Sequence, residues 1–462
     1  MRAKVESSLS SIPLNCVDKS LLALDSINEP MLFHIILSLE GGVDHVRLNK
    51  AIFSAQEAYP VMRTILRSRH FRAFRQIQED LREGVLSVSD QAQLQDTNYE
   101  SYLSQWMNQP LDIKSGFPVK VLLLRKNELE SSLVFTFHHS AADGRGSLLF
   151  VRNVIESYND ELPRDSKSCE DVRINRKGDE LLEFAHSQRP KVENYYMKMI
   201  SSLFHRFIIA ALPPPTKVFH DRTGRSRELR FYFKVVNPGE LEEIQFKARS
   251  AGVAVNDILL AACHIVVEKW NRIHGKASKR LRIMAPVDIG PKEFRDVVFN
   301  QVSWISLSTT PKERADPIKL LRSVKADTTD AARNRAAFSL IYFFYLCSRF
   351  PLWVMKGIAR LFIITRIYVD TIIVTNVGFI WPKSGSGEPA VSNMGNARIV
   401  NVSVSAPVVT PMGLSITVVT YNRNLNLCLS YRSALFSEEK AQMFLDLYVE
   451  ELNNYQVAPE VA

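Results

Sequence analysis

Two adjacent histidines, His138 and His139, are the residues of this 462-residue chain best suited to chemistry. They follow the run Leu-Val-Phe-Thr-Phe at residues 133–137, whose aromatic and β-branched content predicts a buried strand. The apolar spacing of residues 147–158 predicts an amphipathic helix shortly afterwards. The histidines therefore lie where a strand opens into a loop, a frequent position for functional side chains.

A neutral imidazole accepts a proton near pH 7, so a histidine in an apolar channel suits a general base for a hydroxyl or amine nucleophile. Side chains alternate across a strand, which places His139 on the side of Phe135 and Phe137, and His138 on the other side. Only one of the two therefore faces a given pocket. The alternative is a pair of hydrogen-bonded histidines at a strand end with no catalytic role.

Asp143 and Gly144 complete this loop. A carboxylate four residues after His139 favours an anchor, paired with an arginine from elsewhere in the chain, over a second proton carrier. The first candidate for that arginine is Arg282, in a strand predicted at residues 281–287. Gly144 is predicted to allow a backbone conformation that other residues resist.

The pattern His-His-x-x-x-Asp-Gly resembles the signature of a large acyltransferase superfamily. This superfamily includes chloramphenicol acetyltransferase, nonribosomal peptide condensation domains, wax ester synthases and plant alcohol acyltransferases. Further segments resemble the family in the expected order, from about Pro13 to about Tyr448; they are residues 12–15 with Asp18, 30–37, 48–63, 254–262, 286–288, Asn300 with Val302, and 375–378.

The chain also departs from two of these subfamilies. Residues 379–382, after Asn376-Val377-Gly378, lack the Pro-Gly-Pro often found there in wax ester synthases, and the Asp-Phe-Gly-Trp-Gly box of plant alcohol acyltransferases is missing from the sequence. Asn376 and Gly378 also suit an ordinary turn, just as Asn256 and Asp257 suit helix caps. The joint order of the segments carries the resemblance.

The resemblance implies an α/β (α+β) fold of two similar lobes, each a mixed sheet flanked by helices, with a tunnel between them and His139 near its middle. It implies an acyl group arriving as a thioester on coenzyme A or on the phosphopantetheine arm of a carrier protein, with His139 deprotonating the acceptor. The implied supporting residues are His138, Asp143, Gly144, Arg282, Asn300 and Asn376. No covalent acyl-enzyme, metal or tightly bound cofactor is expected.

The strongest helix-breaking signal in the sequence is Pro213-Pro214-Pro215, which ends a helix predicted at residues 195–212. We therefore predict an N-terminal lobe at residues 1–190, a crossover at 191–225 and a C-terminal lobe at 226–462. A hydrophobic content of 46% and a charged content of 23% are those of a globular protein with sizeable cores.

Several common catalytic motifs are missing from the sequence, which has no Gly-x-Ser-x-Gly, Cys-x-x-Cys or His-Glu-x-x-His. The glycine-rich residues 383–387 lack a downstream lysine and indicate a surface turn. The cysteines are scattered and odd in number, which indicates reduced thiols and a cytoplasmic protein; they are Cys16, Cys169, Cys263, Cys347 and Cys428.

The formal net charge of +9 at pH 7 gives information about binding partners rather than about the fold. Basic residues are dispersed among acids without a compact tract of bases and aromatics, which argues against nucleic acid. An acidic acyl carrier protein, the phosphates of coenzyme A or an anionic membrane fit better. The most basic stretches are residues 63–75 and 222–230, and a solvated helix face is the default interpretation of the first.

Residues 338–365 are very apolar but are interrupted by Arg349, Pro351, Lys356 and Arg360, so no span reaches the roughly 20 residues of a transmembrane helix. Buried helices, a wall of an acyl channel and an interfacial helix pair all fit this pattern. The last of these would give a peripheral membrane contact through residues 338–364.

Two functions from different classes follow. The favoured one is an acyltransferase that makes an ester or amide from a thioester donor, with an alcohol, diacylglycerol, sugar or polyketide hydroxyl, or amine as acceptor. The alternative is a non-catalytic module of the same fold for carrier-protein docking or lipid binding. His139, Asp143 and Gly144 occurring together favour the first, because a purely structural role has no need of an imidazole at a channel mouth.

Overall fold

The computed structural model describes residues 11–25, 30–69, 72–79, 84–91, 99–160, 187, 214–224, 228–291, 294–333, 336–365, 370–382, 389–409 and 412–458. Several predictions lie outside these residues. They are the helix at 195–212, Pro213, the glycine-rich turn at 383–387, Cys169 and most of the crossover at 191–225.

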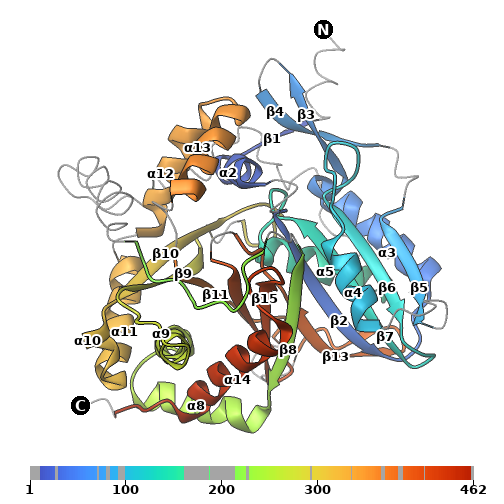
Figure 1. Ribbon diagram of the computed structural model, residues 1–462. Coiled ribbons are helices and arrows are strands. Elements are labelled where there is room, and N and C mark those ends of the chain that lie inside the picture. Colours follow the sequence, from blue (N-terminus) through green and yellow to red (C-terminus); the bar gives the residue numbers. More distant parts are fainter. Residues whose placement is uncertain are drawn as a thin grey trace.

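The first lobe is built on a six-stranded sheet with the order β12-β13-β2-β7-β6-β5 (Figure 1). Its neighbouring strands run antiparallel except for the parallel pair β5 and β6. The strands are β2 (Leu32–Glu40), β5 (Leu86–Asp90), β6 (Val119–Arg125), β7 (Glu130–His138), β12 (Asn393–Met394) and β13 (Ala397–Val404).

The helices of the first lobe bury the two faces of this sheet. Side chains at alternate positions of β2 and β7 pack against α3 (His45–Ala58) and α5 (Gly144–Tyr158), in a core that includes Phe135 and Phe137. On the opposite face, Ile36 and Val134 pack against α4 (Tyr99–Asn108). The predicted strand and the predicted helix on either side of the histidines are therefore both present, as β7 and α5.

The second lobe contains another six-stranded sheet, with the order β10-β9-β11-β14-β15-β8. Here β11 runs parallel to β9 and β14, and the other neighbouring strands are antiparallel. The strands are β8 (Leu229–Val236), β9 (Leu281–Asp288), β10 (Val302–Thr309), β11 (Ile372–Phe379), β14 (Leu414–Tyr421) and β15 (Asn424–Arg432).

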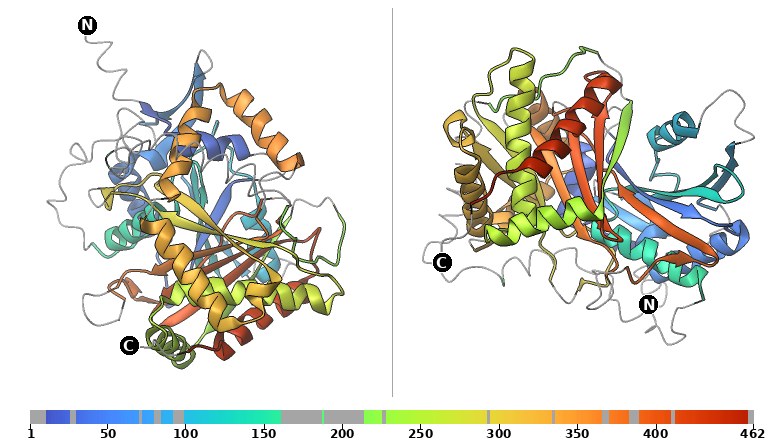
Figure 2. Two further views of the ribbon diagram at one scale, coloured as in Figure 1. Left: turned by 90° about the vertical axis from the view of Figure 1, so that its left-hand side faces the viewer. Right: turned by 90° about the horizontal axis from the view of Figure 1, so that it is seen from below.

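Helices cover one face of the second sheet, as Figures 1 and 2 show. The central one is α9 (Val255–Ile273), which is apolar on nearly all sides and contributes many of the fully buried side chains of this core. Around it pack α8 (Pro238–Ser250), α11 (Pro317–Arg333) and α14 (Glu438–Asn454), and the short α10 (Pro311–Arg314) packs against α11. The predicted α/β architecture of two lobes, each with a mixed sheet and flanking helices, is confirmed.

A small third sheet, with the order β1-β4-β3, stands apart from the two large ones. It joins β1 (Ser11–Pro13) to the hairpin of β3 (Thr64–Arg69) and β4 (Arg72–Ile77), which follows the short 3₁₀ helix η1 (Pro60–Arg63). The basic stretch at residues 63–75 was interpreted by default as a solvated helix face. That interpretation is wrong, because residues 64–69 and 72–75 lie on the antiparallel strands β3 and β4.

The lobes exchange segments, so the predicted boundaries at 1–190 and 226–462 do not describe them. Strands β12 and β13 come late in the chain but pair into the first sheet, where β13 lies antiparallel to β2. In return, α2 (Cys16–Leu24) packs against α12 (Ala336–Ser348) and α13 (Leu352–Thr365) of the second half. Alternating apolar residues predict a strand but not its partner, which is why sequence order misplaced these segments.

The apolar stretch at residues 338–365 forms the two helices α12 and α13, which are separated at Pro351. Leu340 and Ile341 of α12 are fully buried in the core of the second lobe. Among the described residues, no single helix has the length and apolarity needed to cross a membrane; α8 and α9 pass that test only as a pair bent by 100°.

Candidate active site

The loop from His138 to Gly144 connects the end of β7 to the start of α5. Its first residues are still held like a strand, because the His139 amide donates to the Met31 carbonyl at 2.7 Å. A turn follows, in which the Ala141 amide donates to the His138 carbonyl at 2.9 Å. The two histidines therefore keep the opposite orientations that strand alternation predicts.

The His139 imidazole is partly buried, with its ring edge-to-face on Phe33 at a centroid distance of 5.1 Å. Its Nδ1 atom is buried, and the Asn300 side chain and the backbone of Ala142 face the ring. Burial lowers the pKa of this histidine below its ordinary value, because the charged form loses hydration. The ring is therefore neutral at pH 7 and able to accept a proton.

The His138 imidazole, by contrast, has both ring nitrogens engaged and is buried. Its Nδ1 lies 2.8 Å from the Ser140 hydroxyl and accepts from the Ser140 amide at 3.2 Å. Its Nε2 lies 3.5 Å from Asp25 Oδ1, at the C-terminal end of α2. Burial by itself would raise the pKa of Asp25, but the contacts with His138, the Met31 amide and Lys356 together lower it. These contacts give His138 a structural position in the loop.

A buried network holds the backbone of the loop from the side of α2. Asn300 Nδ2 donates to the His139 carbonyl at 2.8 Å and to Asp18 Oδ1 at 2.8 Å. The other oxygen of Asp18 pairs with Arg75 Nη1 at 2.8 Å, and Arg75 Nη2 donates to the Ser140 carbonyl. Two consecutive carbonyls of the loop, those of His139 and Ser140, are thus fixed by side chains from distant segments.

Local sequence explains why Asp18 points at this loop. Asn15 and Asp18 form a capping box at the start of α2, in which each side chain accepts from the other's backbone amide. Asn15 Nδ2 also donates to the Asn300 carbonyl at 3.2 Å. The spacing of Asn15 and Asp18 predicts a helix start, but no local pattern in the sequence predicts the contacts with Arg75 and Asn300. Both Asp18 and Arg75 were absent from the predicted site.

Asp143 anchors the other end of the loop, but not through an arginine. Its Oδ1 accepts from the Gly146 amide at 2.9 Å as the N-cap of α5, and its Oδ2 accepts from the Gln301 amide at 2.7 Å. Burial raises the pKa of Asp143 to about 6, and the two amide hydrogen bonds oppose that rise only in part.

The predicted pairing of Asp143 with Arg282 is wrong. Arg282 lies on β9 as predicted, but its Nε pairs with Asp370 Oδ1 at 2.8 Å, and both side chains are buried in the second lobe. In place of the predicted cation, α5 and residue 301 present two backbone amides to Asp143.

The prediction for Gly144 is also wrong, because its backbone lies outside the left-handed region and a Cβ there would meet nothing within 4 Å. The constraint falls on Gly146 instead. A Cβ on Gly146 would lie 3.3 Å from the Phe299 amide nitrogen and 3.4 Å from the Val298 Cα. The start of α5 therefore packs directly on the segment that leads to Asn300.

Asn376 lies on β11 of the second lobe and is partly buried. Its Oδ1 accepts from the Gly378 amide at 2.9 Å, at a bulge in the pairing of β11 with β14, where Gly378 adopts a φ of +81°. The described hydrogen bond of Asn376 is thus local. It fits the alternative interpretation of Asn376 and Gly378 as an ordinary turn. Asn300 hydrogen-bonds to the histidine loop, whereas the described hydrogen bond of Asn376 stays within β11.

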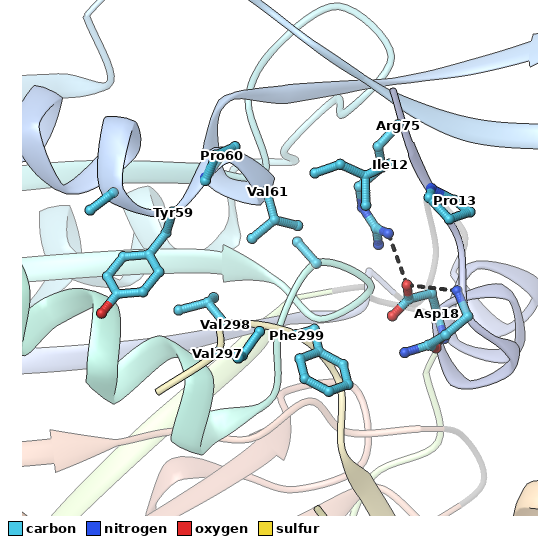
Figure 3. Close-up of a pocket in the computed structure, with 13 residues that line it drawn as sticks. Ile12, Pro13, Asp18, Tyr59, Pro60, Val61, Arg75, Val297, Val298 and Phe299 are labelled. Atoms are coloured by element: carbon cyan, nitrogen blue, oxygen red, sulfur yellow. Dashed lines mark hydrogen bonds and ion pairs between the residues drawn. The ribbon is translucent and has the colours of Figure 1, made fainter. Parts of the chain in front are cut away.

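A pocket of about 60 Å³ adjoins the loop (Figure 3). Ala141 of the loop and the Asp18–Arg75 pair lie at its wall, and its other sides are mainly apolar. The remaining lining residues are Ile12, Pro13, Asn15, Ala58, Tyr59, Pro60, Val61, Val297, Val298 and Phe299. The predicted tunnel centred on His139 stays a prediction. In the described residues, no three His, Cys, Asp or Glu side chains are grouped to hold a metal ion.

Two family models match the chain. Residues 25–337 match the condensation domain, and residues 299–456 match the WS/DGAT C-terminal domain. The first match covers more than half of the chain and includes the whole histidine loop together with Asn300. No curated protein matches the chain.

Solved structures with the same fold cover nearly the whole chain. The first condensation domain of the calcium-dependent antibiotic synthetase, in complex with a substrate analogue, has a TM-score of 0.67 at 15% identity and covers 98% of each chain. An epimerization domain of tyrocidine synthetase B has a TM-score of 0.66 at 14% identity and covers 96% of each chain.

The SgcC5 protein from Streptomyces globisporus has a TM-score of 0.62 at 16% identity, over 96% of this chain and 98% of that one. At such identities the likeness to solved structures shows the fold alone. The match of residues 25–337 goes further, and it places this chain in the condensation-domain family.

Proposed function

We propose that this protein is an acyltransferase that joins an acyl group from a thioester donor to a hydroxyl or amine acceptor. Membership of the condensation-domain family and the match to the WS/DGAT C-terminal domain support chemistry of the acyl-transfer or condensation type. The observation that carries the proposal is the state of His139, a neutral, partly buried imidazole with a lowered pKa on a loop whose backbone is fixed.

In the proposed mechanism, His139 takes the proton of the acceptor as its oxygen or nitrogen attacks the thioester carbonyl. The tetrahedral intermediate collapses by breaking the C–S bond, and the departing thiolate receives the proton from the imidazolium. The enzyme forms no covalent bond to the acyl group. The lowered pKa of His139 suits this role, because a base must be unprotonated before the reaction begins.

The fixed loop supports the same role by positioning. Asn300 and Arg75 bind the carbonyls of residues 139 and 140, which limits the rotation of the peptide that carries the imidazole. Catalysis by proton transfer depends on such fixed geometry, because a small displacement of the base lowers the reaction rate strongly. The donor is proposed to be acyl-coenzyme A or an acyl carrier protein.

The test is the release of free thiol from acyl-coenzyme A and acyl-carrier donors of increasing chain length, with mixed alcohol and amine acceptors. His139→Ala is expected to lower acceptor-dependent release by about 10²- to 10⁴-fold while the fold stays intact. His138→Ala is the control, because it should lose stability through its contacts with Ser140 and Asp25.

Full activity in His139→Ala would refute the general-base assignment. Silence of the unmodified protein across every donor and acceptor would instead favour the non-catalytic module for carrier-protein docking or lipid binding.

A further inference from the structure

The corner between α12 and α13 exposes large apolar side chains. Leu346 is 57% exposed, Phe350 53%, Trp353 69% and Leu361 59%. On α13 the positions 353, 357 and 361 follow each other at intervals of four residues, so Trp353 and Leu361 share one side of the helix with Gly357 between them. Exposed apolar side chains are ordinary when scattered, but grouped ones indicate a contact surface.

The charge of the same segment has one sign. No Asp or Glu occurs from residue 331 to residue 369, whereas the exposed Arg349 and Arg360 and the partly buried Lys356 lie among the apolar side chains. The hairpin of β3 and β4 adds three exposed bases; they are Arg67, Arg69 and Arg72. In Figure 1 and in the left view of Figure 2, this hairpin and the α12–α13 corner project from the same end of the molecule.

The packing of α13 leaves this side open. Its described contacts are chiefly with α2, and Met355 is its buried anchor. Among the described side chains, Trp353 and Leu361 of α13 are exposed. A helix that carries aromatic and aliphatic side chains together with bases on its open side has the pattern of a helix lying in a membrane interface.

We propose that the α12–α13 corner, together with the β3–β4 hairpin, docks this protein on the surface of an anionic lipid membrane. Apolar side chains at the corner enter the boundary between headgroups and acyl chains, and the bases of the corner and hairpin contact lipid phosphates. An acidic protein would also attract the bases, but it would not account for a cluster of exposed Trp, Phe and Leu without a single acid. Each base near such a surface adds roughly a fivefold gain in binding.

The docking surface lies one helix away from the candidate active site. Lys356 Nζ of α13 lies 3.5 Å from the Asp25 carbonyl of α2, and the Asp25 carboxylate contacts His138. Asp18, at the other end of α2, holds the His139 loop through Asn300. A membrane-bound molecule would therefore present its active-site region close to lipid, so that long-chain donors or acceptors reach it without crossing water. This consequence rests on the proposed acyl transfer, whereas the docking itself does not.

The test is flotation of the purified full chain with vesicles of phosphatidylcholine alone and of phosphatidylcholine with phosphatidylglycerol. Binding is expected only to the anionic vesicles and should weaken as salt is raised. Trp353→Ser is expected to lower the partition coefficient roughly tenfold, and Arg360→Glu by about tenfold or more.

Two matched variants on α8, at the opposite end of the molecule in Figure 1, serve as controls. Phe246→Ser removes an apolar side chain that is 64% exposed, and Arg249→Glu reverses an exposed base; both should bind vesicles like the unmodified protein. All four variants change exposed residues, so their melting temperatures should stay the same.

Equal binding to neutral vesicles, or equal losses in the α8 variants, would overturn the proposal. So would binding to an acidic carrier protein but not to anionic vesicles. Thiol release by the unmodified protein on water-soluble donors decides the proposed function separately from this result.

Discussion

Two buried carboxylates hold the histidine loop from opposite ends, and they do so by different means. Asp18 is paired with the guanidinium of Arg75 at 2.8 Å and also accepts from Asn300. Among the described residues, Asp143 accepts from the backbone amides of Gly146 and Gln301, and burial raises its pKa to about 6. One end of the loop is therefore anchored by a charge pair, and the other by a carboxylate that is close to changing its protonation state.

The difference matters because a buried charge without a cation is only partly compensated by amide dipoles. The Asp18–Arg75 pair depends on both side chains, and the loss of either leaves a buried charge. The Asp143 end depends on backbone geometry, so its weak point is the packing that brings the two amides together. The four experiments below separate these two kinds of anchor.

The largest effect is expected from breaking the charge pair. Arg75→Met leaves Asp18 buried without its cation and should destabilise the fold by about 3–5 kcal/mol. Chemical denaturation with a tryptophan fluorescence readout measures this. The double variant Arg75→Met with Asp18→Asn should recover part of the loss, because the uncompensated charge is gone. A single variant that costs less than about 1 kcal/mol would contradict the importance of the pair.

A smaller loss is expected at the other anchor. Asp143→Ala removes an N-cap and leaves the Gly146 and Gln301 amides without their acceptor, which should cost about 2–3 kcal/mol. Acceptor-dependent thiol release should fall as well, since the loop loses its hold on α5. An unchanged melting curve in this variant would disprove the anchoring role.

The pH dependence of stability should carry a contribution from Asp143 that a variant can isolate. Because its folded pKa of about 6 lies above the ordinary value of 3.8, the folded state holds the proton more tightly than the unfolded state between these values. The contribution of Asp143 to the free energy of unfolding is therefore largest below about pH 4. It falls by on the order of 2 kcal/mol between about pH 4 and pH 6, and it is constant at higher pH. The difference in unfolding free energy between the unmodified protein and Asp143→Asn, measured from pH 3.5 to 7.5, should show this fall; a difference that rises with pH would contradict it.

The smallest effects are expected at the two glycines of this end. Gly146→Ala places a Cβ 3.3 Å from the backbone of Phe299 and should cost about 1–2 kcal/mol through overpacking. Gly144→Ala meets open space in the first turn of α5 and should stabilise by about 0.5 kcal/mol. Thermal melts of both variants are enough, and equal effects at the two sites would contradict the close approach of α5 to residues 298 and 299.

Much of the local structure around the site could be predicted from the sequence. Strand β7, helix α5 and the opposite orientations of His138 and His139 follow from hydrophobic periodicity, which acts within one element. The two-lobe architecture followed from the resemblance of several ordered segments to a known superfamily. Asn300 came from the same resemblance, and it lies against the carbonyl of His139.

The contacts between distant segments could not be predicted in this way. Arg282 and Asp143 are both buried, but a sequence does not state which buried acid meets which base, and Arg282 pairs with Asp370. By composition, Arg75 belongs to the same basic stretch as Arg67, Arg69 and Arg72. Those three side chains are exposed, whereas Arg75 turns inward to Asp18. Gly146 carries no signal that distinguishes it from Gly144, since only its contact with residues 298 and 299 constrains it.

The exchange of segments between the lobes has a consequence for how the chain is made. During synthesis, the first sheet stays without its edge strands β12 and β13 until the ribosome has passed residue 404, and the exposed edge of β2 must wait for them. The contacts that fix the histidine loop are equally late, since they join Asn15 and Asp18 to Asn300. Such non-local pairing slows folding. The first lobe should therefore not mature on its own as it emerges, and His139 should reach its final position only after residue 300 has been made.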